Sequence, residues 1–331
     1  MRMRIKRDLP NAIYNCLRKA KSKMMMRRFF RQDIAHLRVR KKSPLFRKEI
    51  LEGIITQEYH RIEKGLSKQS FREGFGQQAL YRLMRALREY KERDFDVQHS
   101  RYRTGLSAIH AYIDRHENSD VDTSHLKEFL SEFGSLENEG LSGVVKITKE
   151  EIIELRDSNF ELLSGSRHSI RYFSNVQVEL QEINEAIRIA MRTPSACNRQ
   201  GWKIRVITDK KCIEQFKRAH NGFANDDQNL STLLLVTSMN NYFSYPKERH
   251  QGYIDAGLFS MSLIYALTYK GLATCVLNAN LTTRNQRMIR ELMNIDCNES
   301  MILFIAVGHY ADLMDITKST RDEINQRVIY I

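Results

Sequence analysis

The sequence contains few of the residues that build disulfide or metal frameworks. Its 331 residues include five cysteines, which are widely separated and form no Cys-x-x-Cys pair. An odd, scattered set argues against a disulfide framework and a zinc knuckle, and it favours a reducing compartment. His220, His250 and Glu248 are not arranged like metal ligands. We therefore expect no metal site.

Long apolar runs are also missing. No stretch approaches the roughly 18 apolar residues of a membrane span, and the basic N-terminus lacks the apolar stretch of a signal peptide. We therefore expect a cytoplasmic protein. The sequence contains no Gly-x-Gly-x-x-Gly turn, Walker loop or Gly-x-Ser-x-Gly elbow, so it offers no dedicated nucleotide-binding turn and no serine hydrolase site.

Positive charge is concentrated in the first 50 residues. They hold 17 Lys or Arg and three acids, a net charge of +14, so the other 281 residues sum to −1. A basic arm of this kind attracts polyanions, including anionic membrane surfaces and nucleic acid. Nucleic acid is the less favoured partner, because few aromatic residues, chiefly Phe29 and Phe30, are available for stacking on bases.

The apolar residues of the arm recur at helical spacing. Ile13, Leu17, Ala20 and Met24 alternate with lysines and arginines, a pattern typical of a helix that lies on a bilayer surface. A helix docked on its own protein with a solvated basic face explains the pattern equally well. The arm therefore predicts either peripheral membrane binding or an internal contact.

The rest of the chain divides at a glycine-rich stretch. Residues 51–116 are helical in pattern, with an apolar stripe at Tyr81, Leu83, Met84 and Leu87, and a further helix is expected over 123–133. Three glycines between 134 and 143 mark a linker, after which Thr148 and Glu151 form a capping-box pattern. We expect a basic arm over residues 1–50, a helical extension over 51–140 and a second domain over 148–331.

The second domain alternates helices with short apolar strands. Strands are expected at 204–207, 233–236, 276–277 and 301–307. The stretch 258–267 is apolar nearly all round, which indicates a helix buried inside the domain or between subunits. Before it, Asp255 suits the first turn of a helix and Gly257 permits close helix packing. These elements predict an α+β domain.

Two polar motifs stand about twenty-five residues apart. The first, Ser166 to Phe173, reads SRHSIRYF. Its five residues 167–171 combine two arginines with a hydroxyl, which suits a phosphate dianion because arginine offers a planar fork of charged donors. The second, Thr193 to Trp202, reads TPSACNRQGW and is rich in hydrogen-bonding groups. Later landmarks are YIDAG at 253–257, KGLATC at 270–275, FIAVG at 304–308 and KSTR at 318–321.

In this order, the motifs resemble those of the FMN-dependent nitroreductase family over roughly residues 150–331. The resemblance implies an α+β fold with a central mixed sheet flanked by helices, and an intertwined homodimer with FMN at the subunit interface. Upstream, HRIEKGL at 60–66 and GFG at 74–76 resemble segments of some bacterial members associated with polysaccharide gene clusters. For these we favour a structural role, with Gly65 as a helix C-cap and Glu63 and Lys64 facing solvent.

The resemblance also implies a set of cofactor contacts. Arg167, Ser169, Lys318 and Arg321 would hold the phosphate, with His168 contributing its backbone amide. Arg171 would lie near the pyrimidine edge of the flavin, where a cation stabilises the negative charge of the reduced ring. The remaining expected contacts, on loops and a strand end, are Pro194, Ser195, Asn198, Gln200, Asn221, Leu277 and Asn278.

Several positions depart from the family pattern. Lys318 and Arg321 are one residue further apart than the usual Lys-x-Arg, so one of them is expected to miss the phosphate. Gly201 replaces a proline before Trp202, which predicts a looser loop. Cys275 has no adjacent base or cation and is expected to be a packed strand residue.

The resemblance implies a homodimeric oxidoreductase in which NAD(P)H reduces FMN, and the resulting NAD(P)+ leaves before an acceptor takes the electrons. The acceptor, whether a nitroaromatic, a quinone or a specialised metabolite, is not selected by the sequence. NAD(P)H would visit the flavin as a diffusing substrate, without a Rossmann domain. The alternative is a flavin-fold binding protein that the basic arm tethers to a membrane or polyanion.

Overall fold

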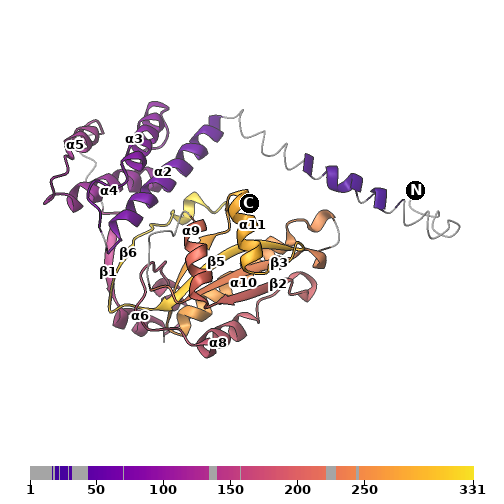
Figure 1. Ribbon diagram of the computed structural model, residues 1–331. Coiled ribbons are helices and arrows are strands. Elements are labelled where there is room, and N and C mark those ends of the chain that lie inside the picture. The colour runs from indigo at the N-terminus through magenta and orange to yellow at the C-terminus, as the bar shows by residue number, and fades with distance from the viewer. Residues whose placement is uncertain are drawn as a thin grey trace.

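The computed structural model describes residues 44–331, apart from 70, 134–139, 157, 221–228 and 244–245, together with helical residues between 17 and 31 other than 18, 22 and 29. In Figure 1, the helices formed by residues 44–131 lie to one side of a sheet that is covered by helices on both faces. A two-stranded ribbon lies between these two parts of the chain.

The helical region has its own hydrophobic core. It comprises α2 (Pro44–Leu66), α3 (Gln77–Glu92), α4 (Ser100–Arg115) and α5 (Ser124–Ser131). Leu83 and Leu87 are fully buried there, and the rings of Tyr90 and Tyr102 stack with their centroids 5.3 Å apart. Tyr81, expected on the same stripe, is 65% exposed because it lies on the outer face of α3. Helix α2 begins before residue 50, so it starts within the range expected for the arm.

The two glycine motifs of the helical region meet at one contact. Gly65 lies inside α2, and a Cβ at this position would stand 1.8 Å from the ring of Phe75. The C-cap role expected for Gly65 is therefore wrong: the residue has no side chain because the Phe75 ring occupies that space. Glu63, expected to face solvent, is instead completely buried.

The sheet of the second domain is antiparallel. Its strands are β2 (Trp202–Ile207), β3 (Thr232–Met239), β4 (Leu272–Asn278) and β5 (Glu299–His309), in the order β2-β3-β5-β4. The α+β class is confirmed, whereas the mixed character of the sheet is limited to one parallel bridge between Ser169 and Thr274. The segment that could supply a parallel strand makes this single bridge and then pairs antiparallel through Phe173 with Tyr310.

Alternate residues of each strand face opposite helical layers, as the two-residue period of a strand requires. Leu233 and Leu235 of β3 pack with α9 (Lys210–Ala219) and α11 (Thr283–Leu292) in one core. Leu234 and Val236 pack with α8 (Leu180–Ala190) and α10 (Gln251–Tyr269) in another. The central strand is therefore apolar on both faces, which explains its continuous hydrophobic sequence.

A short ribbon connects the helical region to this domain. Strand β1 (Val144–Thr148) pairs antiparallel with β6 (Leu313–Thr317), which belongs to the C-terminal part of the chain. The capping box is confirmed at the start of α6 (Lys149–Arg156): the Thr148 amide donates to Glu151 Oε2 at 2.7 Å, and the Glu151 amide donates to Thr148 Oγ1 at 3.2 Å. Helix α7 (Phe160–Ser166) follows and leads into the first motif.

A buried carboxylate joins β2, β3 and β5. The Glu299 side chain has no exposed surface and accepts hydrogen bonds from Arg205 at 2.6 and 2.9 Å, from Lys203 at 2.9 Å and from Thr237 at 2.6 Å. The Arg205 hydrogen bonds, with those of Thr237 and Lys203, lower the pKa of Glu299 to about 2.

We predict that Glu299→Gln lowers the free energy of unfolding by about 3 kcal/mol at neutral pH, because it leaves Arg205 without its counter-charge. The folded-state pKa is depressed, so this stabilisation is present above the unfolded-state pKa of about 4.3 and is lost as pH falls toward about 2. Urea unfolding of both proteins across this range measures the difference. The control is Glu132→Gln, which removes an exposed ion pair with Arg88. If the difference in unfolding free energy between wild type and Glu299→Gln were the same at every pH, the depressed pKa assigned to Glu299 would be contradicted.

Candidate functional site

The first motif lies along the edge of the sheet. Arg167 caps α7, and Ser169 forms the parallel bridge to Thr274 of the edge strand β4. The Ile170 amide donates to the Thr274 carbonyl at 2.9 Å, while Ile170 itself is buried. The backbone of the motif is thereby fixed to β4.

Three basic side chains converge at this edge. Burial lowers the pKa of Arg167, and the nearby positive charge of Arg321 lowers it further. Burial also lowers the pKa of His168, with further contributions from Arg167 and then Arg321. Among the residues that the structure describes, neither arginine forms an ion pair with an acidic side chain. A cluster of cationic donors without a counter-ion is a site for an anion.

Arg321 and Lys318, the two cations expected from the C-terminal segment, lie in different surroundings. Arg321 belongs to the cluster, as its effect on Arg167 and His168 shows. The ammonium of Lys318 instead donates to the carbonyl of Gly140 at 2.6 Å. Ser319, between them, has a positive φ of 48°, which turns the backbone where the segment has its additional residue.

Arg171 lies two residues beyond Ser169 and is half-buried. Its Nη1 donates to the Ser169 carbonyl at 3.3 Å, so the side chain folds back along the motif. It therefore lies beside the cluster and is oriented by the same backbone that β4 holds in place.

The second motif forms a strained loop. Three residues other than glycine have positive φ, namely Cys197 at 53°, Asn198 at 52° and Gln200 at 49°. The Gln200 amide donates to Ser195 Oγ at 2.9 Å and its side chain donates to Asn198 Oδ1 at 3.2 Å. Such conformations persist only where surrounding contacts hold them, and they are concentrated at binding sites. Pro194, which precedes the loop, is exposed.

Asp255 provides one of those contacts. It is buried within α10, where it accepts from the Ala196 amide at 3.1 Å and from Gln251 at 2.7 Å. Because α10 begins at Gln251, the expected helix-start role of Asp255 is wrong. Its carboxylate instead ties the second motif to the helix across 59 residues of sequence.

Gly201 is also explained by packing. A Cβ here would stand 3.0 Å from two atoms of the Phe243 ring, and the Gly201 carbonyl accepts from the Met239 amide at 2.7 Å. The looser loop expected from this glycine is therefore wrong, since the residue is buried and hydrogen-bonded. Trp202 follows directly and stacks on Phe259 of α10 with ring centroids 4.8 Å apart.

The end of β4 brings further expected contacts close to the helical region. Leu277 is buried, and the Asn278 carbonyl accepts from Nε2 of the buried His220 at 2.9 Å. Lys64 of α2 lies near enough to contribute to the lowered pKa of His220, although burial is the main cause. Asn221 lies outside the described residues. Cys275 is buried in β4 as expected.

The two motifs meet α10 at different points. Asp255 holds the second motif near the start of the helix, whereas Tyr265, ten residues further on, lies near Arg167 of the first. Ten residues correspond to a rise of about 15 Å along a helix. Within one chain, α10 therefore separates the two groups of expected cofactor contacts.

Comparison with known families agrees with this arrangement. Residues 165–309 match the family model described as "Nitroreductase family". This part of the chain is similar to the nitroreductase family. The matched nitroreductase region contains both motifs, α10 and all of β5, and it ends before Lys318 and Arg321.

Individual relatives of the nitroreductase region are distant. A protein of Archaeoglobus fulgidus, named provisionally as an NADH dehydrogenase/NAD(P)H nitroreductase, is 24% identical over 150 residues, which cover 45% of this chain and 84% of the relative. A nitroreductase family protein from Clostridium difficile aligns with a TM-score of 0.45 and 22% identity, over 52% of this chain and 98% of its own. One from Streptococcus pneumoniae aligns with a TM-score of 0.45 and 20% identity, over 52% and 100%.

The sequence did not predict two long-range hydrogen bonds. The ties from Asp255 to Ala196 and from His220 to Asn278 join residues 59 and 58 positions apart, and no local pattern marks such partners. Within the described residues, no helix is long and apolar enough to span a membrane, and no group of three His, Cys, Asp or Glu side chains is placed to hold a metal ion.

Proposed function

We propose that the protein is an FMN-dependent oxidoreductase that uses NAD(P)H to reduce a small-molecule acceptor. The observation that carries the proposal is the convergence of Arg167, His168 and Arg321 with no acidic partner among the described residues. This charge arrangement fits the phosphate dianion of FMN. The family match and the name of the A. fulgidus relative support the redox chemistry.

The protein contributes binding and electrostatics to this reaction. When bound, FMN supplies the redox chemistry, taking a hydride from NAD(P)H and delivering electrons to the acceptor. Arg167, His168, Ser169 and Arg321 hold the phosphate, and Arg171 stabilises negative charge on the flavin ring. We infer a ping-pong order, in which the oxidised nicotinamide, NAD(P)+, leaves before the acceptor binds.

We further propose that the active form is a homodimer built on α10. This helix exposes Tyr253, Ile254, Leu258 and Tyr269 to the extent of 49 to 53%, a large apolar surface for a helix that also packs inside its domain. A second copy on this surface would cover it and would bring its own second motif toward the first motif of its partner. Pro194, Ser195, Asn198 and Gln200 would then contact FMN from the second copy.

A second candidate role concerns the basic arm. Leu17, Met24 and Phe30 are 56 to 67% exposed, and the described lysines and arginines among residues 17–31 are exposed as well. Figure 1 shows these helical residues projecting away from the rest of the described chain. Exposed apolar and basic side chains on one helix favour a tether to an anionic membrane surface over a contact with the protein itself.

We predict that the full-length protein, incubated with FMN and freed of excess ligand, shows oxidised-flavin absorbance that bleaches anaerobically with NADH or NADPH. Arg171→Gln should slow the bleaching at least about tenfold, because it removes a charge that stabilises the reduced ring. Arg188→Gln, at an exposed position of α8, is the matched control. A protein that retains no flavin would refute the proposal.

We predict that Leu258→Glu converts the dimer into a monomer, because it places a charge in the apolar surface of α10. Light scattering coupled to size-exclusion chromatography measures the mass, and FMN affinity should fall in parallel. Tyr81→Glu, at an exposed position on α3, is the control and should remain dimeric. A monomeric wild-type protein with full FMN affinity would rule out the dimer proposal.

We predict that the full-length protein pellets with vesicles containing phosphatidylserine and that removal of residues 1–43 abolishes pelleting while FMN binding is retained. Exchange of Lys19, Lys21 and Lys23 for Gln should weaken the interaction by about 1 kcal/mol for each charge removed. Neutral vesicles are the control. Equal pelleting of full-length and shortened proteins would show that the arm is not a tether.

A further inference from the structure

The helical region is bonded to the chain on both sides of Arg321. On the N-terminal side, the Lys318 ammonium donates to the Gly140 carbonyl at 2.6 Å and the Lys318 amide donates to the Gly143 carbonyl at 3.2 Å. The Thr320 hydroxyl donates to the Leu141 carbonyl. The segment 318–320 therefore runs along residues 140–143, the stretch that leads from the helical region into β1.

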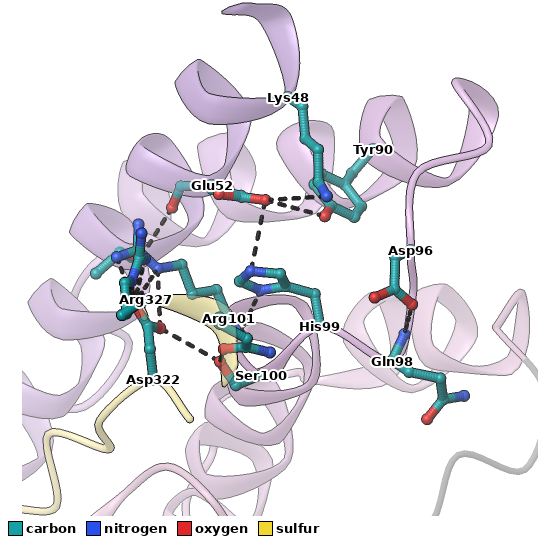
Figure 2. A network of polar contacts seen from close by, with 12 residues as sticks. Lys48, Glu52, Tyr90, Asp96, Gln98, His99, Ser100, Arg101, Asp322 and Arg327 are labelled. Carbon is teal, nitrogen blue, oxygen red and sulfur yellow. Dashed lines mark hydrogen bonds and ion pairs between the residues drawn. The ribbon is translucent and has the colours of Figure 1, made fainter. Parts of the chain in front are cut away.

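On the C-terminal side, α4 holds the residue next to Arg321. Arg101 donates to both carboxylate oxygens of Asp322, with Nε at 3.0 Å from Oδ1 and Nη2 at 2.8 Å from Oδ2. Ser100 Oγ lies 3.3 Å from Oδ1, and Arg327 binds the same carboxylate. Figure 2 shows these side chains directed at Asp322 from α4 and from the C-terminal segment. Arg101, followed by Arg327, holds the pKa of Asp322 well below its usual range, so Asp322 is ionised at neutral pH.

Residues 140–143 are themselves anchored inside the helical region. The buried Glu63 of α2 accepts from Ser142 Oγ at 2.9 Å and from the Gly143 amide at 3.4 Å. The Ser142 amide donates to Ser107 Oγ of α4 at 3.1 Å. A continuous set of hydrogen bonds thus runs from the cores of α2 and α4 to the residues on either side of Arg321.

The position of Arg321 needs this support. Its charge lies near those of Arg167 and His168, which disfavours the arrangement in the absence of an anion. Arg321 is exposed, and its side chain donates a hydrogen bond to the nearby Ser319 carbonyl. Its backbone, rather than its side chain, is what the helical region fixes.

We infer that the helical region is a positioning element of the anion site: Glu63 and Arg101 hold Lys318 to Asp322 so that Arg321 points at the phosphate of FMN. The inference rests on the proposed function. It assigns a role to residues 51–143 and to the HRIEKGL motif, which contains Glu63. It also gives Lys318 a role, because its ammonium donates a hydrogen bond to the Gly140 carbonyl and so holds the segment in place.

The test compares FMN with riboflavin, which has the same ring system and no phosphate. Dissociation constants of both ligands are measured by flavin fluorescence for full-length wild type, Arg101→Gln and Arg321→Gln. We expect Arg101→Gln to weaken FMN binding about tenfold, equivalent to about 1.4 kcal/mol, with riboflavin affinity unchanged. Arg101→Lys, which retains the charge but not the paired hydrogen bonds, should recover part of the loss.

Two further variants separate positioning from general damage. Arg88→Gln removes another arginine–carboxylate pair of the helical region, the one with Glu132. This pair takes no part in the hydrogen bonds that hold residues 318–322, so the variant should leave both affinities unchanged. Thr320→Val removes one hydroxyl and should weaken FMN binding alone, even if Arg101→Gln were to unfold.

Three outcomes would overturn the inference: equal weakening of FMN and riboflavin by Arg101→Gln, unchanged FMN affinity in Arg101→Gln and Thr320→Val, or an Arg88→Gln effect as large as that of Arg101→Gln. Failure of the proposed function gives a different result. In that case wild type itself would bind FMN no better than riboflavin, and Arg321→Gln would change neither affinity.

Discussion

The repulsion between Arg167 and Arg321 is the constraint on which the site depends. The half-buried Arg167 lies near the exposed Arg321, and its pKa is lowered first by burial and then by the charge of Arg321, so the arrangement costs free energy. Each arginine must therefore be held by its backbone. Arg167 follows α7 and precedes the bridge to β4, whereas Arg321 lies between residues that bond to 140–143 and to α4. A bound phosphate would convert this unfavourable pair into a pair of charge-assisted contacts.

The same constraint relates the two parts of the chain. The helical region has its own apolar core, and its links to the C-terminal segment include the β1–β6 ribbon, the polar contacts at 318–322 and a hydrogen bond from Ser100 to Gln326. Strand β6 ends at Thr317, one residue before Lys318. The ribbon therefore sets where residues 318–322 begin, next to the cation cluster. Folding of the helical region and completion of the cation cluster are therefore coupled through a few residues near residue 320.

Local patterns in the sequence predicted local structure well. Strand and helix periodicity located β2 to β5 and α10, and the Thr148–Glu151 pair marked the start of α6. The ordered motifs placed Arg321 with Arg167. The features that could not be predicted depend on partners that are distant in the sequence. Glu63 accepts hydrogen bonds from residues 79 and 80 positions away, and Asp255 accepts one from a residue 59 positions away. Position 65 must be glycine because the Phe75 ring fills the space of a side chain. The local sequence around a glutamate or aspartate in a helix is the same whether its carboxylate faces solvent or accepts a hydrogen bond from a buried amide.

The strained loop of the second motif and the exposed surface of α10 can be explained together. Three non-glycine residues at positive φ cost on the order of 1 to 3 kcal/mol each, and the contacts of Asp255 and Ser195 hold the loop without using the side chain of Asn198 for packing against its own domain. Conformational strain of this size is retained where it places a side chain for a ligand. Because α10 separates this loop from the cation cluster of the same chain, a ligand that contacts both motifs would, in the proposed homodimer, lie between the loop of one copy and the cluster of the other. In that proposal, the exposed apolar face of α10 is the surface that the two copies share.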